Sequence, residues 1–421
     1  MKSATWLILG MMLSGFAFAR QYNVIWNFGS VPNDGWQPEG ALVSDQSGNL
    51  YGTTRIGGVD EGGIVFQLHQ ESDGTWTEAI IYRFCSVIAN SLCTDGANPA
   101  AGLVFDGQGN LYGTTMTGGG FCTITDSCGT VFELSPPNGN MQTWTEKVLY
   151  NFCSDERNGL CLDGNFPLSQ LVFDTVGNMY GTTEEGGMGH WGLNNGAGTI
   201  FELSPSAKGW VHNTLYNFCT QGSGNACPDG AKPVTGLTFD RSGNLYGTTE
   251  NGGGSRGLAF GTIYELSSNG GGWTFAVVYS FAVPIGPGAS VSFDGAGNLY
   301  STTKQGGVFG AGNVFRVSAN HMIRQVSFNG TNGNQPYSGV IVDSRNNVFG
   351  TTSAGGTGFG NIFRIGPSGG LTVLYNFCSQ TNCTDGELPQ ANLLETETGK
   401  IYGSTIEGGA NNQGVVFEVI P

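Results

Sequence analysis

A seven-residue motif, Gly-Asn-Leu-Tyr-Gly-Thr-Thr, recurs along the chain and restricts its fold more than any other feature. Three copies are identical and four are variants, and they stand at residues 48–54, 109–115, 177–183, 243–249, 297–303, 346–352 and 399–405. Self-similarity at such spacing is typical of repeat architectures, in which one small unit buries its apolar face against its neighbours. The chain is therefore expected to be built from seven copies of one unit.

Each unit contains four short stretches with the composition of β-strands. In the second unit these are residues 103–106, 109–115, 129–134 and 144–152, which are rich in Val, Phe, Tyr, Leu and Thr. An Asp-x-x-Gly-Asn turn over 106–110 joins the first two stretches. Four-stranded units repeated in this way predict an all-β fold, a seven-bladed β-propeller with antiparallel blades. A β-helix or linear solenoid is the alternative.

The two ends of the chain support a closed ring. The last unit stops at its third expected strand, residues 415–419, and lacks a fourth. Residues 22–28 match the fourth strand of other units, such as 215–218 and 374–377. The N-terminal strand is therefore predicted to complete the last blade, which closes the ring and protects the sheet edges. Residues 20–421 are expected to form one propeller domain.

The first 19 residues have the pattern of a signal peptide. Lys2 is followed by an uncharged apolar run over 5–18, and Ala17-Phe18-Ala19 forms a small-x-small cleavage site. An uncleaved anchor is the alternative. No later segment is apolar enough to cross a bilayer, so we expect no membrane insertion after signal removal and a secreted or periplasmic location.

Ten cysteines agree with export because they fall into five local pairs. The pairs are Cys85/Cys93, Cys122/Cys128, Cys153/Cys161, Cys219/Cys227 and Cys378/Cys383. Three of these pairs recur at equivalent places in three units, which favours disulfides within loops. A zinc site would need two pairs from different units brought together, so disulfides are the preferred interpretation.

The charge balance limits the partners. The formal net charge is −16, with 32 acidic against 16 basic side chains. An acidic protein repels phosphate backbones and anionic lipid headgroups, so no nucleic-acid partner is expected. Neutral glycans, proteins and cations stay admissible.

The repeat resembles that of the GloVer family, the Gloeobacter–Verrucomicrobia type. The resemblance is carried by the 109–115 motif, the Gly-Gly loop after it and the Gly129-Thr130-Val131-Phe132 strand, and equivalent residues cover nearly all of the expected mature chain. It implies an exported bacterial tandem-repeat protein and implies no particular biochemical activity.

One face of the predicted ring gathers the long loops. In an up-and-down blade the loops between blades lie on the same side as the loops between strands two and three. Five of the inter-blade loops carry an Asp-Gly pair, with the aspartates Asp34, Asp95, Asp163, Asp229 and Asp385. These carboxylates are the candidate ligand-binding residues for a cation or polyol. The alternative is that each carboxylate caps backbone amides within its own turn.

No catalytic or metal site is predicted. The four histidines, His69, His190, His212 and His321, occupy non-equivalent positions in different units. Serine motifs such as Gly253-x-Ser255-x-Gly257 lack the strand-to-helix context of a nucleophile elbow. No cofactor is expected either, because the one dinucleotide-like glycine pattern lies in an all-β context.

These observations favour a secreted, non-enzymatic propeller that acts as a binding or structural module for a glycan or an envelope protein. A carbohydrate-active hydrolase or lyase that uses carboxylates of the loop face is the alternative function. A catalytic site is expected to break the repeat with unique polar residues. The fifth unit instead replaces the cysteine loop with the uncharged segment 282–288, which favours binding over catalysis.

Overall fold

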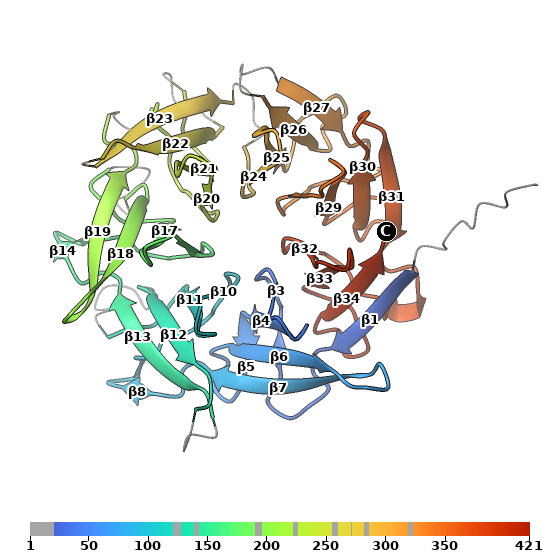
Figure 1. The fold of residues 1–421 in the computed structure, drawn as a ribbon, viewed down its shortest axis with the longest axis horizontal. Helices are drawn as coiled ribbons and strands as arrows, with labels where there is room; N and C mark the ends of the chain where they lie inside the picture. Colours follow the sequence, from blue (N-terminus) through green and yellow to red (C-terminus); the bar gives the residue numbers. More distant parts are fainter. Residues whose placement is uncertain are drawn as a thin grey trace, which may run out of the picture.

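The computed structural model is a ring of seven β-sheets around a central axis (Figure 1). It describes residues 21–120, 128–138, 143–189, 196–221, 226–254, 260–270, 272–281, 286–318 and 323–421. The expected signal peptide, residues 1–19, lies outside this part of the chain. Each of the seven sheets has four antiparallel strands, so the predicted seven-bladed β-propeller is confirmed. The described residues contain no helix long and apolar enough to span a membrane.

We number the blades 1 to 7 in chain order, and each blade runs from an inner first strand to an outer fourth strand. Blade 1 consists of β3 (Val43–Ser44), β4 (Leu50–Thr54), β6 (Ile64–Gln70) and β7 (Trp76–Arg83), and blade 2 of β10 (Val104–Phe105), β11 (Leu111–Thr115), β12 (Thr130–Ser135) and β13 (Thr145–Asn151). Blade 3 consists of β16 (Val172–Phe173), β17 (Met179–Thr183), β18 (Thr199–Ser206) and β19 (Gly209–Asn217), and blade 4 of β20 (Thr238–Phe239), β21 (Leu245–Thr249), β22 (Thr262–Ser268) and β23 (Trp273–Ser280). Blade 5 consists of β24 (Ser292–Phe293), β25 (Leu299–Thr303), β26 (Asn313–Val317) and β27 (Ile323–Ser327). Blade 6 consists of β28 (Ile341–Val342), β29 (Val348–Thr352), β30 (Asn361–Ile365) and β31 (Leu371–Asn376). Blade 7 consists of β32 (Leu394–Glu395), β33 (Ile401–Thr405), β34 (Val415–Ile420) and β1 (Gln21–Asn27).

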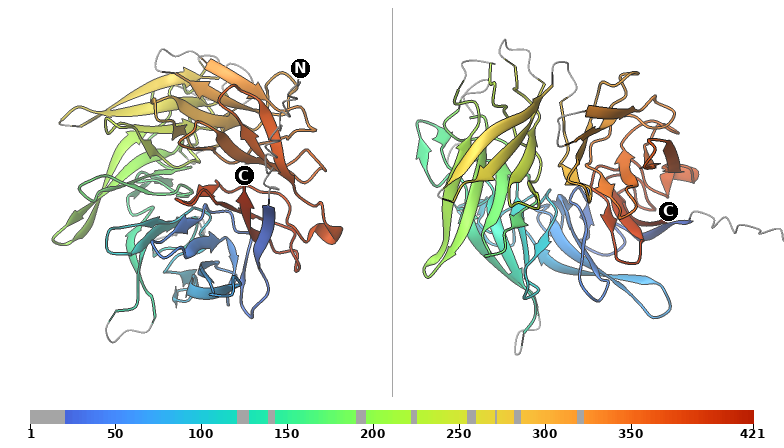
Figure 2. Two further views of the ribbon diagram at one scale, coloured as in Figure 1. Left: turned by 45° about the vertical axis from the view of Figure 1, so that its right-hand side comes forward. Right: turned by 45° about the horizontal axis from the view of Figure 1, so that its top comes forward.

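The N-terminal strand closes the ring. Strand β1 pairs antiparallel with β34, from Gln21 opposite Ile420 to Asn27 opposite Val415, so blade 7 contains both ends of the described chain (Figure 2). Tyr22 of this strand also stacks on Tyr375 of blade 6, with ring centroids 3.7 Å apart. The prediction that residues 22–28 complete the last blade is therefore confirmed.

The repeated motif forms the second strand of every blade, and in six of the seven blades its middle residue is a glycine that packs against an aromatic ring; Ser301 stands there in blade 5. In blade 2, a Cβ atom on Gly113 would lie 2.6 Å from the ring of Phe132 on the neighbouring strand. Gly52 and Gly181 meet the equivalent rings, Phe66 and Phe201, at the same distance. The glycine therefore makes room for a buried aromatic ring that lies flat across the second strand.

That aromatic ring meets a second ring from the preceding blade at every seam. A phenylalanine just after each fourth strand is buried and packs against the third-strand ring of the next blade. The seven pairs are Phe28–Phe66, Phe84–Phe132, Phe152–Phe201, Phe218–Tyr264, Phe281–Phe315, Phe328–Phe363 and Phe377–Phe417, with ring centroids 4.9–5.5 Å apart. Edge-to-face and tilted pairs at such distances are favourable geometries for aromatic rings. One contact type therefore joins all seven blades.

A glycine–proline contact accompanies each aromatic pair. The proline that precedes each first strand packs on the glycine that opens the third strand of the previous blade. A Cβ atom on Gly129, for example, would lie only 2.5 Å from the ring of Pro167. The seven pairs are Gly63–Pro99, Gly129–Pro167, Gly198–Pro233, Gly261–Pro287, Gly312–Pro336, Gly360–Pro389 and Gly414–Pro38. This contact was not predicted from the sequence, although the seven prolines stand in register.

On the opposite side of the ring from the long loops, four seams carry a tyrosine–tryptophan pair. The motif tyrosine of one blade packs against a tryptophan at the start of the next blade's fourth strand. The pairs are Tyr402–Trp76, Tyr51–Trp144, Tyr112–Trp210 and Tyr180–Trp273, with centroids 5.6–6.4 Å apart. These motif tyrosines are thus packed between blades.

The aromatic seam yields a stability prediction at blade 4. Tyr264 replaces the phenylalanine of the other six blades, and its hydroxyl group is fully buried with no hydrogen-bond partner among the described residues. Burying an unsatisfied hydroxyl costs about 1–3 kcal/mol. We therefore expect Tyr264→Phe to raise the free energy of unfolding by about 1 kcal/mol, measured by urea denaturation. Phe201→Tyr in blade 3 is the matched control and should lower it; a destabilised Tyr264→Phe variant would contradict this account.

Ring closure gives a second prediction. Deleting residues 21–27 leaves β34 with an unpaired edge and removes the ring contact between Tyr22 and Tyr375. We expect a lower melting temperature together with concentration-dependent association, because exposed strand edges pair with one another. Adding a synthetic peptide with the sequence of residues 21–29 should restore the monomer. An unchanged melting temperature would show that the strand does not contribute to closure.

Candidate binding face and axial pocket

Short β-bridges hold the inter-blade connections against the loops that join strands two and three. The bridge between blades 1 and 2 pairs Ala97 with Thr117. The corresponding pairs at other blades are Asn165–Glu185, Ala231–Asn251, Pro287–Thr303, Asn334–Ala354 and Glu387–Glu407, and β2 (Gly35–Trp36) pairs with β5 (Ile56–Gly57) in the same way. Both sets of loops therefore lie on one face, which we call the loop face.

Four of the five expected disulfides are present within loops of this face. They join Cys85 to Cys93, Cys153 to Cys161, Cys219 to Cys227 and Cys378 to Cys383. In the described part of the chain, one group of potential metal ligands occurs, Cys378, Cys383 and Glu387, and the disulfide occupies both of its sulfur atoms. The preference for disulfides over zinc is therefore confirmed at these four pairs.

The fifth expected pair, Cys122/Cys128, is described at one end only. Cys128 is buried, 3% exposed, and packs beside Cys153 and Cys161 of the next cysteine loop. It is disulfide-bonded, so the expectation that this cysteine is oxidised is confirmed. Its expected partner, Cys122, lies outside the described residues, so the Cys122–Cys128 pairing itself stays a prediction.

The candidate aspartates are buried anchors of these loops. Asp95 is 2% exposed, and one carboxylate oxygen accepts hydrogen bonds from the Tyr82 hydroxyl at 2.9 Å and the Ser86 backbone amide at 3.0 Å. The same tyrosine bond recurs at Tyr150–Asp163, Tyr216–Asp229 and Tyr375–Asp385, at 2.6, 2.9 and 2.6 Å. Each aspartate thus fastens its loop to the outer strand of the preceding blade.

The fifth aspartate keeps the backbone contacts without the tyrosine. Asp34 accepts from the amides of Ser30 at 3.0 Å and Gly35 at 2.7 Å, and Trp26 occupies the place of the tyrosine. The structure distributes the five aspartates over five seams. Their burial and their amide contacts favour the turn-capping interpretation, and ligand binding by these carboxylates stays a prediction.

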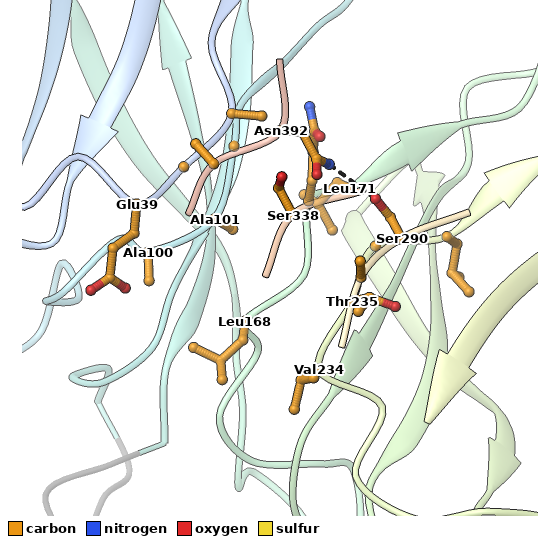
Figure 3. Close-up of a pocket in the computed structure, with 18 of the residues that line it drawn as sticks. Glu39, Ala100, Ala101, Leu168, Leu171, Val234, Thr235, Ser290, Ser338 and Asn392 are labelled. Atoms are coloured by element: carbon orange, nitrogen blue, oxygen red, sulfur yellow. Dashed lines mark hydrogen bonds between the residues drawn. The ribbon is translucent and has the colours of Figure 1, made fainter. Parts of the chain in front are cut away.

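The ring axis holds a pocket of about 400 Å³ lined by residues at and just before the first strands (Figure 3). At the position two residues before each first strand, two amide side chains, Gln170 and Asn392, stand among five small residues. Gln170 of blade 3 donates to the Leu103 carbonyl of blade 2 at 2.7 Å. Asn392 of blade 7 donates to the Ser290 hydroxyl of blade 5 at 2.9 Å, a bond drawn in Figure 3. The first bond joins adjacent blades, and the second links blade 7 to blade 5 past blade 6.

Glycines face the two amide side chains. A Cβ at Gly102 would lie 3.1 Å from the amide carbon of Gln170, and one at Gly339 would lie 3.1 Å from the Asn392 oxygen. One carboxylate lines the pocket among the described residues, that of Glu39. It pairs with Arg55 at 3.2 Å, while burial raises its pKa.

A family model described as the Gloeobacter/Verrucomicrobia repeat matches the chain over residues 15–193, 85–293 and 187–417. These overlapping segments include every described blade. The chain belongs to the Gloeobacter/Verrucomicrobia repeat family. The resemblance carried by the 109–115 motif is thereby confirmed. No curated protein shows significant sequence similarity to the chain.

Within this Gloeobacter/Verrucomicrobia repeat, one outer-strand position lies beside the aspartate of the preceding seam in blades 1 to 3. It is defined by its partner on the third strand, such as Leu134 opposite Glu146 in blade 2. We call it the rim position; its seven residues are Glu78, Glu146, His212, Phe275, Ile323, Leu371 and Tyr22. Four of these residues are aromatic or aliphatic, so the three ionisable groups of blades 1 to 3 depart from the repeat. The position was not predicted from the sequence, because strand register was needed to align it.

The three ionisable rim residues carry shifted pKa values. Burial, helped by the nearby Asp95 carboxylate, raises the pKa of Glu146 to about 7. Burial and Asp34 raise the pKa of Glu78 in the same direction. Burial lowers the pKa of His212 to about 4, against the opposing effect of Asp163, and the ring stacks on Tyr150 at 4.5 Å. His212 therefore favours its neutral form near neutral pH, whereas Glu146 changes its charge near pH 7.

The opposite signs of these shifts predict a matched pair of pH effects. The pKa of Glu146 is about 7 in the folded chain, above its ordinary value of 4.5, so the stability that this group contributes is complete below pH 4.5 and is lost as the pH rises through 7. His212 has a lower pKa folded, about 4 against 6.5, so its contribution is complete above pH 6.5 and is lost as pH falls through 4.

We therefore expect Glu146→Gln to reduce the fall in stability above pH 5 and His212→Phe to reduce the fall below pH 6. Thermal denaturation of each variant from pH 4 to pH 9 measures both slopes. Lys147→Gln, an exposed neighbour on the same strand, is the control and should leave the profile unchanged. Parallel profiles for the wild type and both rim variants would show that these groups titrate alike in the folded and unfolded chains.

Proposed function

We propose that this chain is an exported, non-enzymatic binding propeller that recognises a protein partner with its loop face. The proposal rests mainly on apolar side chains exposed in the loops between strands two and three. Val308 and Phe309 of blade 5 are 81% and 65% exposed, and Val59 of blade 1 is 65% exposed. Met188 and Phe359 extend the set to blades 3 and 6. Loops on a rigid scaffold are where binding residues concentrate.

The distribution of exposed apolar residues supports this face over the others. Seven of the eleven large hydrophobic residues that are exposed in the described chain lie in loops of this face. Besides the five above, they are Val87 and Ile88 of the first cysteine loop. Single exposed hydrophobic residues are ordinary, whereas sets that share one surface mark interaction sites. Aliphatic and phenylalanine side chains of this kind complement a protein surface better than a polyol.

Ion pairs reduce the negative charge of the same face. Lys232 lies 2.8 Å from Glu184 and 3.5 Å from Glu185, while Lys304 lies 2.7 Å from Glu250. The five candidate aspartates are buried and hydrogen-bonded within their loops, so they are poorly placed to attract a cation. A protein ligand therefore fits the surface better than a metal ion.

A glycan in the axial pocket is the second candidate function. The pocket volume of about 400 Å³ suits a small ligand, and Ser338, Tyr337 and Gln390 add polar groups to its wall. Glycoside cleavage usually requires two carboxyl groups that flank the scissile bond. Since Glu39 is the one carboxylate lining the described pocket and is paired with Arg55, binding is favoured over hydrolysis there.

Site-specific photocrosslinking tests the loop-face proposal. We expect a benzoylphenylalanine at position 309 or 359 to crosslink one envelope protein in cells, because these side chains reach solvent on the binding face. The same photoreactive residue at Val211 or Val277, which are exposed apolar positions of outer strands, is the matched control. Crosslinks that form only at the control positions would reject the loop face.

A double variant supplies an independent readout. Val308→Ser with Phe309→Ser should abolish the crosslink made from position 359 and leave the melting temperature within about 2 °C, because exposed side chains contribute little to stability. Purified protein is also screened on a glycan array. Glycan binding that persists in the double variant but is lost in Gln390→Ala would support the axial pocket instead.

A further inference from the structure

Blade 6 lacks the tryptophan that covers the motif tyrosine at four other seams. In blades 1 to 4 the tryptophan stands two residues before the rim position, as Trp273 stands before Phe275. Leu371 is the rim residue of blade 6, opposite Ile365, so the tryptophan's place is taken by Gly369. The hairpin of blade 6 turns at this point, with Gly369 donating to the Gly366 carbonyl at 2.8 Å. Within the described chain, no indole of blade 6 therefore covers Tyr300 of blade 5.

A second aromatic ring is missing at the same seam. In blades 2 to 5 the first strand ends in a phenylalanine, at Phe105, Phe173, Phe239 and Phe293. The first two of these rings pack edge-to-face on the preceding motif tyrosines at 5.1 Å. Val342 occupies this position in blade 6. The seam between blades 5 and 6 has thus lost two rings relative to the seams between blades 1 and 4.

A pocket of about 420 Å³ occupies the place of these rings. Tyr300, Val314 and Arg316 of blade 5 form one wall, and Val348, Ile365 and Pro367 of blade 6 form the other. Val314, Val348 and Ile365 belong to a buried hydrophobic cluster, so the pocket extends from the surface to the core. Strands β25 and β26 of blade 5 and strands β29 and β30 of blade 6 carry most of these residues, and the two blades are neighbours in the ring (Figure 1). Four other seams of this ring show that an indole ring fits such a site.

Arg316 places a positive charge in this pocket beside the Asp294 carboxylate, and Arg364 stands at the same third-strand position in blade 6. The residue paired with the motif tyrosine on the third strand is Gln67, Glu133, Glu202 or Glu265 in blades 1 to 4. In blade 5 it is Arg316, opposite Tyr300. Arg316 is partly buried and makes no salt bridge with any described residue. Its guanidinium group can therefore pair with an acid carried by a ligand in the pocket.

We propose that this seam pocket is a binding site for an indole-sized aromatic ring that bears an anionic group. The ring takes the place of the missing tryptophan against Tyr300, and the acid pairs with Arg316. Because the turns between strands one and two and the hairpins lie on the face opposite the long loops, this site is separate from the proposed protein-binding face. If the pocket bound no such ligand, the proposed function of the loop face would be unaffected.

Titration with indole-3-acetate and with indole tests the site. We expect saturable binding of one indole-3-acetate per chain, and weaker binding of indole, measured by calorimetry at constant ionic strength. Arg316→Glu restores the acidic residue of blades 2 to 4. It should weaken indole-3-acetate binding at least about tenfold, as the loss of a charge-assisted contact implies, and should leave indole binding unchanged. Absence of saturable binding of either probe to the wild type would overturn the proposal.

Two pocket-filling variants locate the binding. Gly369→Trp places an indole at the position used in blades 1 to 4, but Gly369 has a φ of +90° and its substitution strains the turn. Ala296→Trp fills the same pocket from an exposed turn where blade 3 carries Val176, and it keeps the proposal testable if the first variant fails to fold. Either folded variant should abolish binding. Binding that persists unchanged in a folded filled variant would overturn the proposed location.

A gain-of-site control uses the seam between blades 2 and 3. Trp210→Gly removes the indole that packs on Tyr112 and leaves Glu133, rather than an arginine, opposite that tyrosine. We expect this variant to bind two molecules of indole but still only one of indole-3-acetate, and to gain melting temperature when indole is added. An unchanged indole stoichiometry would contradict the inference that the tryptophan's place accepts a free ring.

Discussion

The contact between two aromatic rings at each seam is the interaction on which the rest of this ring depends. A ring from the end of one blade meets a third-strand ring of the next, and the motif glycine beside it leaves room for that packing, as Gly113 does for Phe132. The same geometry repeated seven times sets the angle between blades. That angle in turn sets the width of the axial pocket, where Gln170 and Asn392 span the remaining space. Substituting one ring would therefore disturb both the local core and the closure of the ring.

The loops of the binding face are held by polar contacts rather than by a core of their own. At four seams a buried aspartate joins a loop to an outer strand, and a disulfide and a β-bridge hold the same loop in place, as at Asp95, Cys85–Cys93 and Ala97. A buried carboxylate must be hydrogen-bonded or it destabilises the fold. Because three kinds of contact fix the loop of Asp95, its apolar side chains Val87 and Ile88 can face solvent without loosening the scaffold beneath them.

The repeat made the architecture predictable, since seven motif copies, four strand-like stretches per unit and a displaced N-terminal strand leave few topologies. The four described disulfides were predicted from the same periodicity. The rim position could not be found in this way. The seven rim residues belong to six residue types, and a bulge shifts the register of most of their strands, as between Val131 and Phe132. The aspartates showed a second difficulty: sequence periodicity brings them to one face, but only coordinates show that their carboxylates are turned inward and bonded.

This protein differs from a purely structural ring at the seams where the sevenfold pattern is broken. Where the repeat is intact, each seam fills its own space, and a ligand would have to displace a packed tryptophan. Between blades 5 and 6 the chain has instead replaced a tryptophan by Gly369, a phenylalanine by Val342 and an acidic residue by Arg316. The first two changes remove buried apolar area, which costs about 25 cal/mol per Å², and the third adds a charge that forms no salt bridge with a described residue. These changes at one seam are not needed for folding, since the seams between blades 1 and 4 fold with both rings. A bound aromatic acid would return both the lost contact area and the missing counter-charge.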